Sequence, residues 1–253
     1  MMTTFDFDDG NGPVPAHKHP NGGGWVADTA TVDETACVGA EARVFGNAKV
    51  YDNAQVYGNA TVFDNAMVLN NAQVYDNAKV YGDARVYDNA EVFGNAKVYD
   101  NVMVGDDAKV SGNAKVFGNT KVYDNAWVSG KAKVYDNARV SGKAMVYGNA
   151  WVYDNAKVCG DARVYGNAQV YDNTIVGGDA QVFGNAKVYD NAWVYDNARV
   201  YYNARVYDNA RVCGDARVFA DAGLHLDDVK DSDTNEDIFI EMSGKRYKLV
   251  EVV

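Results

Sequence analysis

Histidine is the first residue type that the sequence lacks. The chain has only three, His17, His19 and His225, so none lies in the long stretch between the second and the third. Because histidine is the side chain most easily used as a general base near neutral pH, this absence argues against acid–base catalysis along that stretch. Exposed aspartates, which are common there, titrate well below neutral pH and are poor substitutes. We therefore favour a protein that is not an enzyme.

Cysteine is equally scarce, and its pattern argues against a disulfide scaffold. Cys37, Cys159 and Cys213 are an odd number, and no C-x-x-C pair is present. The first residues, MMTTFDFDDG, lack the basic and apolar regions of a signal peptide, and no apolar run reaches the length of a membrane span. These absences predict a cytoplasmic protein without membrane contact.

The chain also lacks an excess of positive charge. Its formal net charge is -11, and the segment between Ala30 and Ala222 contains 19 Lys and Arg against 23 Asp and Glu. Neither this segment nor the acidic flanks form a basic surface, so we expect no nucleic-acid partner. The frequent Lys and Arg in the segment also argue against a protein that mimics DNA.

What the sequence has in abundance is a six-residue repeat. Of the 33 positions at multiples of six from 30 to 222, 30 are Ala, and the exceptions are Val102, Thr120 and Thr174. Two residues after each of these positions, from Val32 to Val218, all 32 residues are Val. No residue is inserted or deleted, and the repeating unit is A-x-V-[Y/F]-[D/G]-N.

This unit predicts a short strand followed by a corner. Ala and Val two residues apart point to the same side of a strand, whereas a helix needs apolar residues at a period of about 3.6. The x residue and the aromatic residue then point outward. The Asp-Asn, Gly-Asn or Gly-Asp pairs that follow tolerate the left-handed backbone of a tight corner. A chain of such units is a β-solenoid.

The run AKVYDNAQVYGNA, from Ala48 to Ala60, resembles the left-handed parallel β-helix of the hexapeptide-repeat superfamily. The resemblance covers about 193 residues, and it implies three hexads in each triangular coil of 18 residues and the left hand of the coil. The superfamily includes acyltransferases and carbonic anhydrases, so the resemblance makes these two enzyme activities candidates. Near-perfect repeats of this kind are similar to those of superfamily members that phages and bacteria encode. If the chain is a phage protein, the resemblance implies that it is part of the virion.

The sequence tests the 18-residue coil by itself. Face one consists of the strands that begin after Ala48 and every 18th residue from it, face two of those after Ala54, and face three of those after Ala60. Ten hexads lack Tyr or Phe after Val; seven of them lie on face one, three on face two and none on face three. If these ten hexads were distributed at random over three faces, face three would contain none of them in only about two per cent of cases. We therefore predict an all-β, left-handed parallel β-helix of about eleven coils with capped ends.

Three regions follow from this pattern. Residues 1–26 are expected to cap the N-terminal end, with Trp25 covering the first coil, because an open sheet edge invites fibre growth. Residues 27–222 form the β-helix. Residues 223–253 contain an acidic linker and then IFIEMSGKRYKLVEVV, whose alternation around Ser243-Gly244 predicts a β-hairpin.

Face three carries an aromatic residue after Val in every coil. The candidate partner-binding residues there are Tyr81, Tyr99, Phe117, Tyr135, Tyr153, Tyr171 and Tyr189. Lys79, Lys97 and other basic residues lie beside them. One interpretation is ladder stacking of good strand formers with lysine stems over the rings. The other is a flat aromatic and cationic surface for a glycan or a protein.

Face one is the irregular face and is the candidate for self-association. Its outward apolar residues are Met67, Leu69, Met103, Ile175 and Trp193. Small outward residues such as Gly105 and Gly177 lie beside them, and small residues let a second backbone approach closely. The superfamily commonly forms trimers, so the resemblance implies a trimer or a dimer through this face. Drift on an unselected face explains the same residues equally well.

Two short motifs are candidate ligand sites. His17 and His19 form an H-x-H pair, which supplies only two of the ligands that zinc needs. The glycines from Asn21 to Gly24 are not followed by the Gly-Lys-Ser/Thr of a phosphate loop. The sequence predicts no metal and no cofactor.

Together these observations predict a rigid, non-enzymatic scaffold or binding protein. It self-associates and presents the Tyr/Lys surface of face three to a protein or glycan partner. The alternative is an acyltransferase-like enzyme whose site lies between subunits.

Overall fold

The computed structural model describes residues 3–220, 238–242 and 245–249, which divide into two compact units. Unit 1 comprises residues 1–125 and unit 2 comprises residues 126–253. Every regular element among the described residues is a β-strand, which confirms the predicted all-β class. In this part of the chain no helix is present that could cross a membrane.

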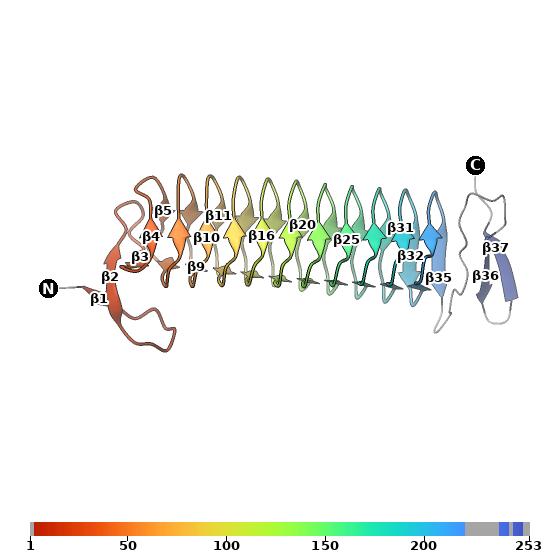
Figure 1. Cartoon of the computed structure of the whole chain (residues 1–253), viewed down its shortest axis with the longest axis horizontal. Helices are drawn as coiled ribbons and strands as arrows, with labels where there is room; N and C mark the ends of the chain where they lie inside the picture. Colours follow the sequence, from red (N-terminus) through yellow and green to blue (C-terminus); the bar gives the residue numbers. More distant parts are fainter. Residues whose placement is uncertain (1–2, 221–237, 243–244, 250–253) are drawn as a thin grey trace. The chain divides into compact units, whose positions relative to one another are not determined.

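Unit 1 is a stack of coils in which short strands alternate with tight corners (Figure 1). Its face-one sheet contains β4 (Thr31–Val32), β7 (Lys49–Val50), β10 (Met67–Val68), β13 (Arg85–Val86), β16 (Met103–Val104) and β19 (Lys121–Val122). Its face-two sheet contains β5 (Cys37–Val38), β8 (Gln55–Val56), β11 (Gln73–Val74), β14 (Glu91–Val92) and β17 (Lys109–Val110). Its face-three sheet contains β1 (Thr4–Phe5), β2 (Val14–Lys18), β3 (Trp25–Ala27), β6 (Arg43–Val44), β9 (Thr61–Val62), β12 (Lys79–Val80), β15 (Lys97–Val98) and β18 (Lys115–Val116).

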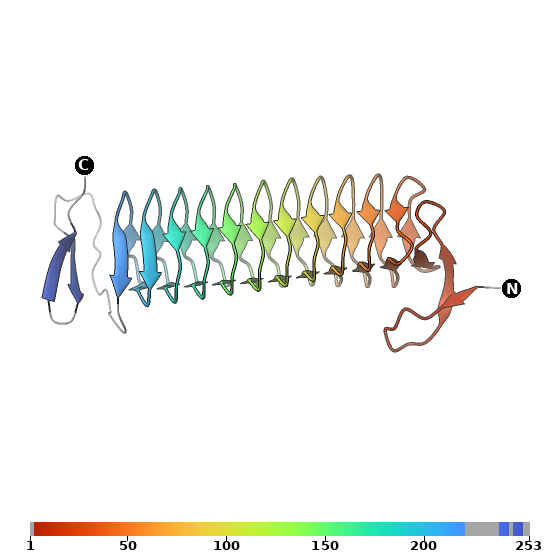
Figure 2. The same ribbon diagram turned by 180° about the vertical axis from the view of Figure 1, so that it is seen from behind.

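Unit 2 follows the same plan, and Figure 2 shows its coils from behind. Face one contains β22 (Arg139–Val140), β25 (Lys157–Val158), β28 (Ile175–Val176), β31 (Trp193–Val194) and β34 (Arg211–Val212). Face two contains β20 (Trp127–Val128), β23 (Met145–Val146), β26 (Arg163–Val164), β29 (Gln181–Val182), β32 (Arg199–Tyr202) and β35 (Arg217–Ala220). Face three contains β21 (Lys133–Val134), β24 (Trp151–Val152), β27 (Gln169–Val170), β30 (Lys187–Val188) and β33 (Arg205–Val206).

Within each unit, the strands of the coils pair in parallel with the strand one coil away, and the partners are 18 residues apart. Met67 pairs with Arg85 in unit 1, for example, and Ile175 pairs with Trp193 in unit 2. The backbone N–H of Lys97 donates to the carbonyl of the next coil, 2.9 Å away. The predicted coil of 18 residues and the parallel solenoid of about eleven coils are thus confirmed.

The inward residues form the core of each unit. The repeat valines from Val38 to Val218 are at most 2% exposed. The alanine positions from Ala36 to Ala210 are buried too, and so are their three replacements, Val102, Thr120 and Thr174. Burying one valine contributes about 1.5 kcal/mol or more, so the many thin layers together can offset the cost of ordering the chain.

Each corner is made by the two residues that follow the outward aromatic position. The first, usually Asp or Gly, has a left-handed backbone, with φ of 58° at Asp76 and 69° at Gly94. Glycine adopts this conformation without a steric penalty and Asp tolerates it, which explains the restricted choice of residue. The second, usually Asn, bonds to its equivalent in the next coil, as Asn77 Nδ2 does by donating to Asn95 Oδ1 at 3.2 Å. The predicted left-handed corner is confirmed for the first of the two residues.

The N-terminal end of unit 1 is covered by antiparallel strands. β1 pairs with β2, and β2 pairs with β3, which already belongs to the face-three sheet. Phe7 and Ala16 from this region are buried. The expectation that Trp25 covers the first coil is wrong. Trp25 is an outward residue in register with Arg43, because its neighbour in the strand is a core valine, and the ring of Phe5 stacks on it at 4.4 Å.

Two strands pair antiparallel in the segment for which a hairpin is predicted. β36 (Ile238–Met242) pairs antiparallel with β37 (Lys245–Leu249), and Met242 is the partner of Lys245. The predicted acidic linker and the Ser243-Gly244 turn lie outside the described residues.

Candidate functional site

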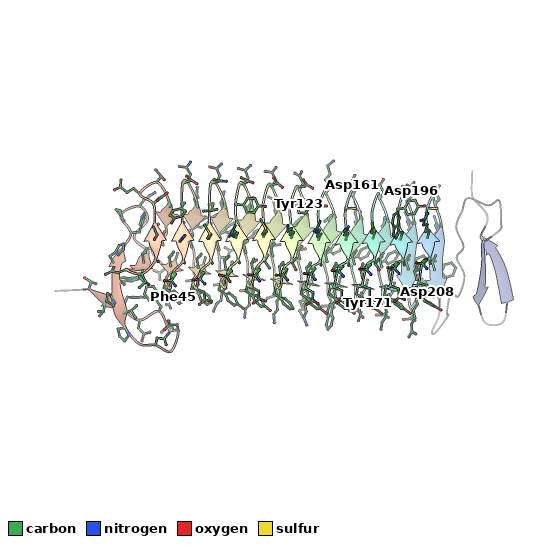
Figure 3. The ribbon with its side chains drawn as sticks, in the orientation of Figure 1. Phe45, Tyr123, Asp161, Tyr171, Asp196 and Asp208 are labelled. Carbon is green, nitrogen blue, oxygen red and sulfur yellow. The ribbon has the colours of Figure 1, made fainter. Side chains whose placement is uncertain are left out.

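The outward aromatic residues of face three form one ring stack in each unit. In unit 1, Phe45, Phe63, Tyr81, Tyr99 and Phe117 stack with neighbouring centroids 4.8–5.1 Å apart. In unit 2, the stack contains Tyr135, Tyr153, Tyr171, Tyr189 and Tyr207. Tyr171 projects outward from its coil (Figure 3). Neighbouring rings are close to parallel, so their faces contact one another. Phe45 and Tyr207 are buried, and the other rings of the two stacks are half-buried.

This stacking changes what the surface can bind. The structure brings the seven candidate residues of face three into these two stacks, as the ladder interpretation expects. A flat ligand cannot lie on rings whose faces are already occupied. What face three offers instead is phenolic hydroxyl groups, from Tyr81 and Tyr99 in unit 1 and from every ring of the stack in unit 2, and a phenol can donate and accept a hydrogen bond.

The tyrosine hydroxyl groups of these stacks stay protonated well above neutral pH. Burial, and then the neighbouring Tyr99 and Asp100, raise the pKa of Tyr81. Burial, followed by Tyr189 and Asp172, raises the pKa of Tyr171 to about 12. These hydroxyl groups are therefore neutral under ordinary conditions and act through hydrogen bonds.

Beside the ring stack of unit 1 runs a column of three lysines, Lys79, Lys97 and Lys115, which we call the Lys column. Lys79 is in register with Lys97, and Lys97 with Lys115. Among the described residues, none of the three has a carboxylate within ion-pair distance. Sequence analysis found these lysines, but it did not show that they lack a carboxylate partner.

Face two of unit 1 contains a hydrogen-bond network that sequence analysis missed. The Tyr75 hydroxyl donates to Glu91 Oε2 at 2.8 Å, and Lys109 Nζ donates to Glu91 Oε1 at 2.9 Å. Burial alone would raise the pKa of Glu91, but the hydrogen bonds from Lys109 and Tyr75 outweigh it and lower the pKa. The Tyr57 hydroxyl donates to the Gln73 side chain in the same diagonal way, at 3.0 Å. The bonded residues are 16 or 18 apart in sequence, a separation that short motifs do not cover.

The candidate interface residues of face one are only partly accessible. Met67, Leu69, Met103 and Ile175 are half-buried, and Trp193 is 42% exposed. Along unit 1 the first outward residue alternates between cationic and apolar, in the order Lys49, Met67, Arg85, Met103 and Lys121. In unit 2, Ile175 is next to Trp193, and the guanidinium of Arg211 lies 5.1 Å from the Trp193 ring. The structure thus places the candidate interface residues on face one: Met67, Leu69 and Met103 in unit 1, and Ile175 and Trp193 in unit 2.

A shallow hollow lies at the corner after face one in unit 1. Its lining residues are Asp52, Asn53, Asn70, Asn71, Asp88, Asn89, Asp106 and Asp107. Its carboxylates bond to the backbone, since Asp106 Oδ2 accepts the N–H of Asp124 at 3.0 Å. In unit 2 the same corner carries Asp161 and Asp196 (Figure 3). Asp196 Oδ2 accepts the N–H of Gly214 at 3.1 Å, so aspartates such as Asp106 and Asp196 link successive corners.

The two N-terminal histidines are held apart by different partners. His17 Nδ1 lies 2.9 Å from Asp28 Oδ1, whereas His19 is buried with its Nδ1 3.2 Å from the carbonyl oxygen of Asn21. Across the described residues, no group of three or more His, Cys, Asp or Glu side chains is arranged to hold a metal ion. No disulfide bond joins the three cysteines, all of which are described, and burial raises the pKa of the Cys159 thiol.

In-register coils around buried Ala and Val columns define a β-solenoid repeat protein. Comparison with family models agrees with this class, because nine segments of the chain are similar to the YdcK β-solenoid repeat. The matched segments are residues 54–70, 72–88, 132–148, 138–154, 156–172, 162–178, 180–196, 204–218 and 210–225. No curated protein matches the chain significantly.

Proposed function

We propose that this β-solenoid is a non-enzymatic cytoplasmic scaffold that self-associates through face one and binds a protein or glycan partner through face three. The observation that carries the proposal is the Lys column beside Tyr81 and Tyr99, because no carboxylate among the described residues lies within ion-pair distance of its three lysines. The regular core supports it, because identical layers hold these groups at a fixed spacing. We also propose the left-handed coil that the hexapeptide resemblance implies.

Replacement of tyrosines tests partner binding at face three. In the Tyr99→Ser, Tyr135→Ser, Tyr171→Ser variant, binding to a glycan array or to candidate proteins should be lost while the circular dichroism spectrum is retained. The matched Tyr→Phe variant keeps the ring stack and removes only the hydroxyl groups. Its loss of binding would identify the hydroxyl groups as the binding element. Unchanged binding in the Ser variant would contradict the role of face three.

Light scattering tests self-association. A Met103→Lys, Ile175→Lys variant places a charge in face one of each unit, so a wild-type dimer or trimer should dissociate. The control variant, Gln55→Lys, Gln181→Lys, adds the same charge to face two. A wild-type monomer, or equal dissociation of both variants, would contradict an interface on face one.

The enzyme alternative has its own test. An acyltransferase-like site between subunits requires that the oligomer bind acyl-CoA. Saturable acyl-CoA binding by the wild type that the Met103→Lys, Ile175→Lys variant loses would replace the scaffold proposal.

A further inference from the structure

The Lys column is a costly arrangement within the protein alone. Neighbouring strands of a sheet lie about 4.8 Å apart, and like charges directly opposite each other destabilise a sheet. Lys79, Lys97 and Lys115 follow one another in three consecutive coils, and no described carboxylate is close enough to form an ion pair with any of them. An external anion that lies along the column would remove this repulsion.

Elsewhere in unit 1 the same fold avoids such a column. On face two, Lys109 follows Glu91 in the next coil, and the two form an ion pair at 2.9 Å. On face one, an apolar residue separates successive cations, as Met103 does between Arg85 and Lys121. The coil geometry therefore allows a cation to pair with a carboxylate or to be separated from the next cation by an apolar residue. Neither arrangement is present in the Lys column.

Neutral hydrogen-bonding groups flank the Lys column on both sides. On one side is a ladder of exposed Asn side chains, in which Asn77 Nδ2 donates to Asn95 Oδ1, and Asn95 Nδ2 to Asn113 Oδ1 at 3.3 Å. Each amide uses one N–H in this ladder and keeps a second one for a ligand. On the other side are the hydroxyl groups of Tyr81 and Tyr99. Amide and ammonium groups are present in all three coils, and hydroxyl groups in the first two, because the third coil carries Phe117. Together these groups form a narrow strip along the coils.

The geometry of the strip selects the class of ligand. One cation per coil at a spacing of about 4.8 Å suits an extended polymer that carries its anionic groups in a line, and a sugar unit has a comparable length. Single-stranded nucleic acid is disfavoured, because its bases stack on exposed aromatic faces, and the Tyr81 and Tyr99 faces contact each other and their neighbours. Asp100 beyond the ring stack also limits the width of an anionic ligand.

We propose that the Lys column, with the Asn ladder and the tyrosine hydroxyl groups beside it, binds a linear anionic glycan that runs from coil to coil. Its carboxylate or sulfate groups contact successive ammonium groups, and its sugar hydroxyl groups bond to the amides and phenols. This inference rests on the proposed function, since it names the partner class for face three.

Direct titration of the full-length protein tests the proposal. The probes are fluorescently labelled polygalacturonate, which carries carboxylates, and dextran sulfate, which carries sulfates; uncharged dextran and poly-L-glutamate are titrated in parallel. We expect saturable binding of at least one anionic glycan, weakening as salt rises, and none of dextran. The two glycan titrations distinguish the carboxylate source from the sulfate source, and binding of either supports the proposal.

A charge-neutralised variant locates the site. Lys79→Gln, Lys97→Gln, Lys115→Gln should lower the affinity at least about tenfold, because charge-assisted hydrogen bonds to the ligand are lost. It should also flatten the dependence of affinity on salt. The changes lie in exposed or half-buried positions, and circular dichroism verifies that the coils remain.

The matched control removes the same number of charges from face one of the same unit. Lys49→Gln, Arg85→Gln, Lys121→Gln should keep the affinity within about twofold of the wild type. Equal losses in both variants would overturn the proposal, because they would indicate unspecific attraction of a polyanion. Binding of poly-L-glutamate without either glycan would also overturn it, and would leave face three as a protein-binding surface as proposed above. If no probe binds while the Tyr→Ser variant still loses a protein partner, only the glycan inference fails.

Discussion

The ring of Tyr87 occupies the space that a β-carbon on Gly105 would need, one coil further along face one of unit 1. Gly105 is itself buried under this ring. A small outward residue suggests a place where a second backbone can approach, but at this position the chain has already filled it. The self-association proposed for face one therefore has to use the partly accessible apolar residues, such as Met103, and not the space beside Gly105.

This contact predicts that Gly105→Ala destabilises unit 1. The new methyl group would displace the outer end of the half-buried Tyr87 ring, which can turn aside, so the cost should be at the low end of overpacking, about 1 kcal/mol. The midpoint of urea unfolding measures the effect. Gly177→Ala is the matched control in unit 2, because a β-carbon there would meet only Cys159 Sγ, at 3.3 Å. Equal losses for the two variants would show that Tyr87 packing is not the cause.

A second prediction concerns the two threonines in the alanine columns. Thr120 Oγ1 donates to the carbonyl of Phe117 at 2.7 Å, whereas Thr174 Oγ1 is buried without a hydrogen-bond partner. Thr174→Val keeps the shape and removes the unsatisfied hydroxyl group, so it should raise the free energy of unfolding by about 1 kcal/mol. Thr120→Val removes the hydrogen bond to the Phe117 carbonyl, so it should not raise the free energy of unfolding. A stabilised Thr120→Val variant, or a weakened Thr174→Val variant, would contradict this reasoning.

Most of the fold could be predicted because its causes are local and repeated. The two-residue spacing of Ala and Val sets the inward direction, and the lack of insertions fixes which residues lie above one another. Face membership of residues such as Tyr99 and Lys97 then follows by counting. The failure at Trp25 has a related cause, since the first strand begins at this residue and the antiparallel strands before it follow no repeat.

The candidate site was predictable in its composition and not in its contacts. Counting placed Tyr81 and Tyr99 in one column, but ring orientation depends on side-chain rotamers that the repeat does not specify. The bond from Tyr75 to Glu91 runs diagonally between coils for the same reason. Rotamers decide whether a surface lysine lies near a carboxylate, so only the structure shows that the Lys column has no ion-pair partner among the described residues.

A third prediction concerns the corner at Tyr202. This residue has φ of 56° and is 57% exposed, in the corner position that glycine occupies one coil earlier at Gly184. A left-handed backbone costs a residue other than glycine about 1–2 kcal/mol, so Tyr202→Gly should stabilise unit 2 by roughly 1 kcal/mol. Thermal unfolding followed by circular dichroism measures the change. Tyr201→Gly, which removes the ring that stacks on Phe183 at 5.1 Å, should instead destabilise. A less stable Tyr202→Gly variant would mean that the tyrosine side chain contributes more than the strained backbone costs.

The last prediction is the pH at which the tyrosine stack of unit 2 fails. The pKa of Tyr171 is about 12 in the folded chain, because burial and then Tyr189 and Asp172 favour the neutral hydroxyl, and about 10 for an unfolded tyrosine. Between these values the folded state holds more protons than the unfolded state, so stability is full below pH 10 and falls as the pH rises towards 12. Tyr171→Phe removes this ionisation and keeps the stack, so alkaline unfolding should begin at a higher pH while stability at neutral pH is unchanged.

The reverse change, Phe183→Tyr, adds a hydroxyl group between Tyr165 and Tyr201 on face two and should shift unfolding to lower pH. Tyrosinate absorbance and circular dichroism, recorded together against pH, measure both effects. An unchanged alkaline midpoint in Tyr171→Phe would show that this hydroxyl group does not limit the alkaline stability of the stack.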